Sequence, residues 1–376
     1  MTMRTELIAE PGTVVVKVGT NVLANSEGML DRARIESLAS QIQSIRARGW
    51  KVVLVSSGAI GAGVGKLNLG KRPTDLPHLQ ACAAIGQTAL MQMYQEALAP
   101  HGILPAQILL TAGDFDSRAR YLNVRNTILT LFEYDSLPII NENDTVAVAE
   151  IKFGDNDQLA AMVSNLMRAK LLVLLTNVDG LYSADPGVDP AAKLLDVVPD
   201  IDADVAGLAG VSKSNLGTGG MRSKLKAARL ATSAGGAVVM ANGSRDGILE
   251  SLFAGANVGT LFLPQTGVVP AWKRWIGLTA RSKGILRIDP GAKVALIQHG
   301  KSLLPVGVHS VIGEFGKGDV VSICDDAGAE FARGLSNYSS ADASRIAGLN
   351  SEQMTELLGK VPYPELVHRD NLTVMA

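Results

Sequence analysis

Lysines and glycines stand together at points of the sequence where predicted strands end and helices begin. In "GTGGMRSKLKAA" (217–228), three glycines precede Lys224, which falls one turn inside a predicted helix. Glycine lets backbone N–H groups approach an anion just ahead of a helix N-terminus. A helical side chain leans back toward that end, so the ammonium group of Lys224 can reach the same anion. The segment therefore predicts a phosphate site, with a surface loop and a solvated lysine as the alternative.

A second lysine, Lys17, lies at the end of the predicted strand 13–19, within "KVGTNVL". An ammonium group at the carboxyl end of a strand, beside the flexible Gly19, can contact a phosphate. A lone lysine in such a position is more often simply solvated, because lysine is rarely buried without a partner. The interpretation of Lys17 as a phosphate ligand therefore depends on other groups at the same site.

The glycine-rich stretch "SSGAIGAGVGKL" (56–67) superficially resembles a P-loop. A P-loop has glycine five residues before its Gly-Lys pair and Ser or Thr after the lysine, but Ile60 and Leu67 stand there. No GxGxxG pattern follows the first strand either, which disfavours a dinucleotide site. Ser56, Ser57 and the backbone N–H groups of the predicted loop remain candidates for binding a carboxylate or a phosphate. A tight glycine turn is the alternative.

Two acidic segments complete this set of chemically capable residues. "INENDTV" (140–146) is a strand-to-loop transition rich in Asn, Asp and Glu, and "KFGDNDQ" (152–158) places Asp155, Asn156 and Asp157 at a helix start. An ordinary N-cap, worth ~1 kcal/mol, would explain the second segment without any chemistry. Two lysines at one phosphate site need a carboxylate between them to fix their positions, and Asp157 is the candidate.

The elements that position these residues alternate between short aliphatic runs and longer amphipathic segments. This alternation predicts an α/β fold with a mainly parallel open sheet sandwiched by helices. Ligands of such sheets lie beyond the carboxyl ends of the strands. The predicted strands are 13–19, 51–58, 104–111, 137–144, 171–177, 236–243 and 259–264, and the predicted helices are 30–49, 77–99, 120–133, 156–170 and 221–235.

After residue 264 the alternation of short aliphatic runs and longer amphipathic segments ends. The stretch 264–280 holds two prolines and two tryptophans. We therefore expect a first domain over 1–264, a linker over 265–281 and a second domain over 282–376. Short runs punctuated by Gly, Pro or Asp predict a small β-barrel in the second domain. Its predicted strands are 284–289, 293–298, 309–315, 318–324 and 330–339, followed by helical pieces at 341–348 and 351–358.

Composition narrows the class of protein. The chain has 376 residues, a formal net charge of −1 and 47% hydrophobic residues, so no global field attracts nucleic acid or membranes. Its two cysteines, Cys82 and Cys324, form no CxxC pair, which suggests neither a disulfide framework nor a zinc site. The start has no signal-peptide core, and the longest aliphatic runs are strand-sized. We therefore expect a cytoplasmic protein.

The motifs together resemble those of the glutamate 5-kinase family, a branch of the amino acid kinases. The matching pieces span nearly all of 13–263, and "INEND" followed by "FGDND" is the most specific to this branch. The C-terminal part resembles a PUA domain. The quoted pieces are "VVKVGTNVL", "VSSGAIGAG", "INENDTVAVAEIKFGDNDQLAA", "LLTNVDGLY-ADP", "GTGGMRSKLKAA" and "GTLF".

This resemblance implies transfer of the ATP γ-phosphoryl group to the side-chain carboxylate of L-glutamate, with Mg²⁺, as the first step of proline biosynthesis. Lys17 and Lys224 would neutralise charge on the transferring group, and Asp157 would orient both lysines. The residues that would bind glutamate are Ser57, Asp144 and Asn156, with Asp144 as the partner for its ammonium group.

The resemblance also assigns a nucleotide site. Its residues would be Lys17, Thr176, Asn177, Thr218, Gly219, Gly220, Met221, Arg222, Ser223 and Lys224. Asn177 is a departure, because many relatives have Asp after the Thr of "LLT". A nucleotide contact made by backbone or an amide survives this change, whereas one that needs a carboxylate does not.

Alternatives remain open at this point. Another acceptor within the same family (acetylglutamate, aspartate, carbamate or UMP) is the nearest. An RNA-binding role through the PUA-like domain is a second, although residues 281–376 carry 10 Lys+Arg and 11 Asp+Glu and so lack the expected basic excess. The resemblance further implies feedback inhibition by L-proline, a homo-oligomer (dimer or tetramer) and a glutamyl-phosphate reductase partner. Membrane and nucleic-acid partners are not expected.

Overall fold

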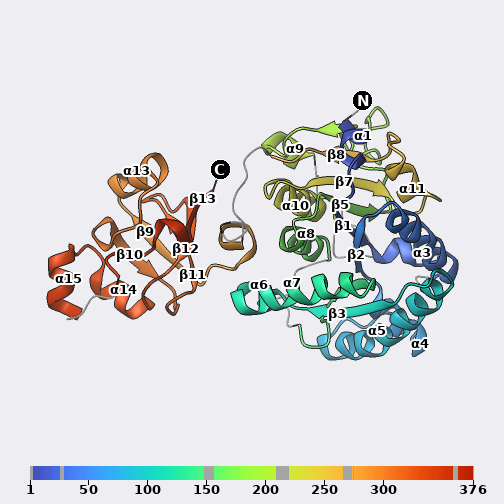
Figure 1. Cartoon of the computed structure of the whole chain (residues 1–376), viewed down its shortest axis with the longest axis horizontal. Helices are drawn as coiled ribbons and strands as arrows, with labels where there is room; N and C mark the ends of the chain where they lie inside the picture. The colour runs from blue at the N-terminus through green and yellow to red at the C-terminus, as the bar shows by residue number, and fades with distance from the viewer. Residues whose placement is uncertain are drawn as a thin grey trace. The chain divides into compact units, whose positions relative to one another are not determined.

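In the computed structural model, the chain divides into two compact units, Met1–Val268 and Val269–Ala376 (Figure 1). The division falls inside the segment 265–281 that was expected to be a linker. The structure describes residues 3–25, 29–147, 156–208, 220–265, 273, 275–358 and 363–375.

The first unit is built on an eight-stranded sheet in the order β3-β4-β2-β1-β5-β7-β8-β6. All neighbouring strands pair in parallel except β7 and β8, so the predicted mainly parallel sheet is confirmed. The four strands at its centre, β2, β1, β5 and β7, are buried on both faces, which explains their mostly aliphatic sequences. The strands are β1 (Thr13–Val18), β2 (Lys51–Ser56), β3 (Pro105–Leu110), β4 (Leu137–Glu142), β5 (Leu171–Thr176), β6 (Val197–Val198), β7 (Ala237–Asn242) and β8 (Thr260–Phe262).

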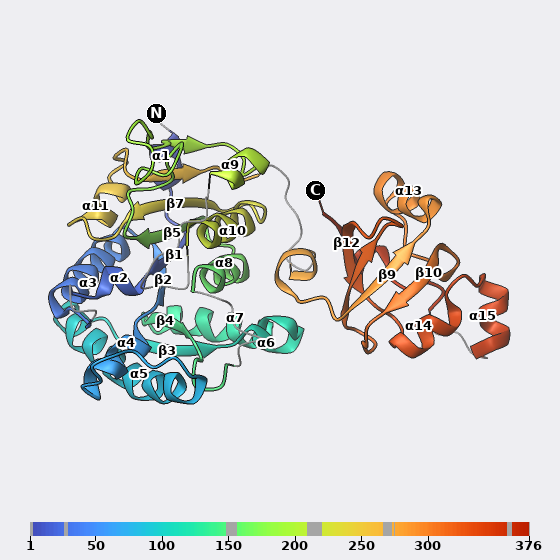
Figure 2. The same ribbon diagram turned by 180° about the vertical axis from the view of Figure 1, so that it is seen from behind.

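Helices cover both faces of this sheet. Figures 1 and 2 show α3 and α11 on one face and α8 and α10 on the other. The core between the sheet and α3, α5 and α11 contains Val16 and Val18 of β1. The helices are α1 (Met3–Ile8), α2 (Thr20–Leu23), α3 (Arg32–Ala47), α4 (Ala59–Lys66), α5 (Leu76–Leu98), η1 (Ala99–His101), α6 (Ala112–Asp116), α7 (Arg118–Glu133), α8 (Asn156–Met167), α9 (Ala203–Gly207), α10 (Met221–Thr232) and α11 (Ile248–Phe253).

The glycine-rich segment after β2 forms helix α4, which corrects the expectation of a loop there. Only Gly58, with φ 109°, makes a left-handed turn before the helix starts. Within α4 the glycines allow close packing on α5. A Cβ atom on Gly63 would lie 1.9 Å from the carbonyl oxygen of Cys82, and one on Gly86 would lie 1.7 Å from that of Ala59. These glycines therefore serve helix packing.

We expect Gly86→Ala to lower the free energy of unfolding by about 3 kcal/mol, because the new methyl group meets backbone that cannot move without separating α4 from α5. Urea denaturation measures this difference. The matched control is Gly70→Ala, where an added Cβ meets no atom within 4 Å. Equal stabilities for the two variants would contradict the close packing of these helices.

The second unit contains a five-stranded sheet in the order β10-β9-β11-β12-β13. All its pairs are antiparallel except β9 with β11, and its core includes Leu286, Ile323 and Tyr338. Its elements are η2 (Trp275–Thr279), β9 (Gly284–Ile288), α13 (Pro290–His299), η3 (Pro305–Gly307), β10 (Val308–Ile312), β11 (Val320–Cys324), β12 (Glu330–Leu335), α14 (Ser340–Ile346), α15 (Ser351–Leu358), η4 (Arg369–Asn371) and β13 (Leu372–Val374).

Helix α13 corrects the strand predicted at 293–298. Asp289 caps this helix by accepting the backbone N–H of Ala292 at 2.8 Å, and Pro290 occupies its first position. Gly300 ends it in a left-handed conformation with φ 56°. These start and stop signals outweigh the strand propensity of the apolar run between them.

Candidate active site

Lys17, Asp157 and Lys224 come together beyond the carboxyl end of β1. The ammonium nitrogen of Lys17 lies 2.5 Å from Asp157 Oδ1, and that of Lys224 lies 3.0 Å from Asp157 Oδ2. All three residues are buried, with exposed fractions of 5%, 0% and 8% respectively. One carboxylate thus pairs with two ammonium groups that come from different elements.

The backbone explains why these side chains converge. Lys17 alternates with Val16 and Val18 along β1, so it faces the side of the sheet that carries α8 and α10. Asp157 lies in the first turn of α8, and Lys224 lies in the first turn of α10. Both side chains can therefore reach the end of β1 from helix starts.

The electrostatics of this cluster favour an incoming anion. Burial alone would raise the pKa of Asp157, but the ammonium groups of Lys17 and Lys224 hold that pKa below its ordinary value. The carboxylate is therefore ionised at neutral pH. Two ammonium groups against one carboxylate leave the cluster with a net positive charge.

The start of α10 offers backbone donors beside this charge. Gly220 precedes the helix and has no side chain to cap it. The partial positive charge at a helix N-terminus favours an anion. Met221, Arg222 and Ser223 form the first turn, and Arg222 is exposed. Thr218 and Gly219, also assigned to the nucleotide, lie outside the described residues.

A network of side-chain amides lies next to the cluster. Asn156 Nδ2 donates to Ser57 Oγ at 2.8 Å, to the carbonyl oxygen of Ser56 at 3.0 Å and to Asn141 Oδ1 at 2.9 Å. Asn141 Nδ2 in turn donates to Gln87 Oε1 at 2.9 Å. The structure therefore brings the predicted residues Ser57 and Asn156 together.

This network also contains two residues that the sequence prediction missed as site residues. Asn141 lies inside the quoted "INENDTV" segment, so a signal for it was present. Gln87 lies in the middle of α5 and carries no such signal.

The other predicted residues lie at the ends of neighbouring strands. Asp144 is partly buried in the turn after β4, and its N–H donates to the carbonyl oxygen of Glu142 at 2.9 Å. Thr176 ends β5 and is buried, and its hydroxyl group lies 3.3 Å from Asn177 Oδ1. Asn177 is exposed. All three residues lie at the carboxyl ends of the strands, as Lys17 does.

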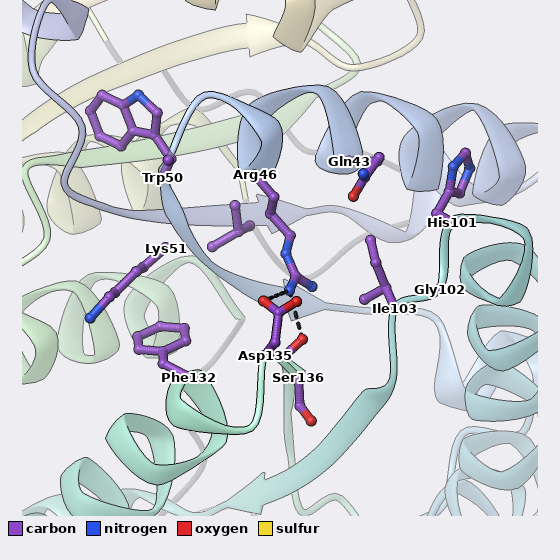
Figure 3. A pocket seen from close by; sticks show the side chains of 12 residues that line it. Gln43, Arg46, Trp50, Lys51, His101, Gly102, Ile103, Phe132, Asp135 and Ser136 are labelled. Atoms are coloured by element: carbon purple, nitrogen blue, oxygen red, sulfur yellow. Dashed lines mark hydrogen bonds and ion pairs between the residues drawn. The ribbon is translucent and has the colours of Figure 1, made fainter.

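A pocket of about 360 Å³ lies at the amino ends of the strands, opposite the end that carries Lys17 (Figure 3). Lys51 starts β2 there, and Asp135 and Ser136 precede β4. Arg46 of α3 donates to the carbonyl oxygen of Asp135 at 2.6 Å and pairs with its carboxylate. This pocket is therefore separate from the Lys17 site.

The described part of the chain contains no group of three or more His, Cys, Asp or Glu side chains arranged to hold a metal ion. It also contains no helix with the length and hydropathy needed to span a bilayer.

Comparison with known proteins identifies the relatives of this chain. The model of the amino acid kinase family matches residues 12–242, and that of the PUA domain matches residues 284–358. Glutamate 5-kinase of Pelobacter propionicus is 46% identical over 99% of this chain and 100% of its own length. Glutamate 5-kinase of Caldanaerobacter subterraneus is 45% identical over 96% of this chain and 97% of its own length. The structure of carbamate kinase from Giardia lamblia bound to AMP-PNP is 18% identical, with a TM-score of 0.48 over 69% of this chain and 100% of that chain.

Proposed function

The chain belongs to the amino acid kinase family, and within it to the glutamate 5-kinases, so we propose that it phosphorylates the side-chain carboxylate of L-glutamate with ATP. The product is L-glutamyl 5-phosphate, and the reaction is the first step of proline biosynthesis. The observation that carries this proposal is the buried Lys17–Asp157–Lys224 cluster with its net positive charge.

The chemistry explains what such a cluster does. A carboxylate oxygen of glutamate forms a bond to the γ-phosphorus as the bond to the β–γ bridging oxygen breaks, and ADP leaves. A carboxylate is already ionised at pH 7, so no general base is needed. The difficulty is repulsion, because two unit charges ~4 Å apart repel by about 4 kcal/mol at an effective dielectric constant of 20. Lys17 and Lys224 offset this repulsion with preorganised positive charge.

The residues also fit a nucleotide that brings its own metal. Lys17 and Lys224 already engage both oxygens of Asp157, so that carboxylate is not a free metal ligand. Mg²⁺ bound together with the nucleotide would supply further neutralisation of phosphate charge. In this proposal the start of α10 and Thr176 contact ATP.

The acceptor binds at the amide network. Ser57 and Asn156 contact glutamate, and Asp144 pairs with its ammonium group. Asn156 Oδ1 supports this placement, because it is buried and has no hydrogen-bond partner among the described residues. A buried acceptor without a partner costs free energy that a ligand N–H can recover.

Hydroxamate trapping tests the proposed activity. With ATP, Mg²⁺ and L-glutamate, the acyl phosphate reacts with hydroxylamine to give γ-glutamyl hydroxamate and phosphate. We expect L-glutamate to be the preferred acceptor over aspartate, N-acetylglutamate, carbamate and UMP. The release of ADP measures the activity with each acceptor. Equal or greater ADP release with another acceptor would contradict the glutamate assignment.

Regulation and partners form the finer part of this proposal. L-Proline, the end product of the pathway, would inhibit the kinase by feedback. A reductase would consume the labile acyl phosphate. Adding proline to the trapping assay checks the first point. RNA binding by the second unit is checked separately, by a salt-dependent shift of labelled RNA at micromolar protein.

A further inference from the structure

We propose that Gln87 is a positioning residue for the acceptor site, which acts through Asn141 to fix the side-chain amide of Asn156. This inference rests on the proposed function. Gln87 is 8% exposed and Asn141 is 2% exposed, so both amides are buried. Buried amides need hydrogen-bond partners. Their orientation is set by neighbouring backbone groups, because a backbone N–H can only donate and a carbonyl oxygen can only accept.

The orientation of Asn141 follows from a backbone donor. Its Oδ1 accepts the N–H of Glu142 at 2.9 Å, and a backbone N–H cannot become an acceptor. Asn141 Nδ2 must therefore face away from it, toward Gln87 Oε1. Loss of that oxygen would leave a buried N–H without a partner, which favours rotation or displacement of Asn141.

The orientation of Asn156 follows from Asn141 and a backbone acceptor. Both Asn141 Oδ1 and the carbonyl oxygen of Ser56 accept from Asn156 Nδ2. The amide of Asn156 cannot flip without losing both bonds. Its Oδ1 is thereby held at the other end of the planar amide group, as the acceptor without a protein partner among the described residues. This oxygen can take an N–H from the ammonium group of the substrate.

The fold places Gln87 accurately for this role. The preceding residue, Gly86, touches the backbone of α4 at Ala59, just after the Ser56–Ser57 turn. Helix α5 is therefore fixed against the same turn that contacts Asn156. Gln87 links this helix to the end of β4, so one amide ties together the elements around the acceptor.

We expect Gln87→Leu to raise KM for L-glutamate roughly tenfold, because a buried donor on Asn141 loses its partner. KM for ATP and kcat should stay within about twofold of wild type, because Lys17, Asp157 and Lys224 are untouched. Gln87→Glu keeps an oxygen at this position and should restore KM to within about threefold. Gln92→Leu, on the exposed side of the same helix, is the matched control.

Several outcomes would overturn the inference. Unchanged KM for L-glutamate in Gln87→Leu would do so, as would equal changes in KM for ATP and in kcat. If the leucine variant does not fold, Gln87→Asn is the second test, since its shorter side chain withdraws the oxygen from Asn141 and should also raise KM for L-glutamate.

A spectroscopic arm separates this inference from the proposed function. In protein labelled with ¹⁵N-asparagine, Gln87→Leu should shift the side-chain amide signals of Asn141 and Asn156 without any substrate, and Gln92→Leu should not. Unshifted signals would refute the positioning role even if the wild-type protein phosphorylates glutamate. If Gln87→Leu shifts these signals but the wild-type protein does not phosphorylate glutamate, only the proposed function is refuted.

Discussion

Replacing Lys224 with methionine is expected to lower the turnover of glutamate phosphorylation by roughly 100-fold or more. Methionine keeps the length and the packing of the side chain but removes the ammonium group that lies 3.0 Å from Asp157. The cluster then has one cation and one carboxylate, so its net positive charge disappears. Lys17→Met should have an effect of the same size, because it removes the other cation. Hydroxamate trapping at saturating substrates measures both.

Lys226→Met is the matched control, because Lys226 lies on the same helix and is exposed. Circular dichroism and gel filtration show whether each variant remains folded. Near-full turnover of a folded Lys224→Met protein would refute the assignment of this lysine to the transferring phosphoryl group. A rise in KM for ATP alone would assign it to ground-state nucleotide binding.

The central sheet was predictable from sequence because its signal is local. Continuous aliphatic runs such as "LLVLL" are typical of strands buried on both faces, and amphipathic segments between them indicate crossover helices. The same runs also locate the strand ends, where Lys17 and Thr176 lie. Helix starts gave Asp157 and Lys224. Lys17, Asp157 and Lys224 are identified by their positions within single elements, whereas the role of Thr176 was implied only by the family resemblance.

Features that depend on contacts between elements were not predictable in the same way. The glycines of α4 indicate a loop by local propensity, but they serve a close contact between two helices. Gln87 has no chemical signal in its own segment, and its role follows only from its distance to Asn141. The error at α13 has a different cause, because Asp289, Pro290 and Gly300 are local signals that the apolar run obscured.

A second large effect is expected for Asp157→Asn. The substitution leaves two ammonium groups buried near each other without a counter-charge, and removing one partner of a buried ion pair costs about 3 kcal/mol or more. We therefore expect a loss of unfolding free energy of this size at pH 7, together with a large loss of turnover. Urea denaturation measures the first effect and hydroxamate trapping measures the second.

The pH dependence of stability distinguishes this role from simple loss of packing. The pKa of Asp157 in the folded protein lies below its ordinary value of 3.8, despite burial, because Lys17 and Lys224 stabilise the carboxylate. A group with a lowered folded pKa contributes stability that is fully present above its unfolded pKa and is lost as pH falls through the folded value. The contribution of Asp157 is therefore present near pH 7 and is lost below about pH 4.

It follows that the stability difference between wild type and Asp157→Asn should be largest near neutral pH and should narrow as the pH falls below about 4. Asp135→Asn is the matched control, because this carboxylate is 95% exposed and its partner Arg46 lies at the other edge of the sheet. It should change stability by less than about 1 kcal/mol at every pH. A difference for Asp157→Asn that does not vary with pH would mean that the side chain contributes through packing, and the two lysines would then need another counter-charge.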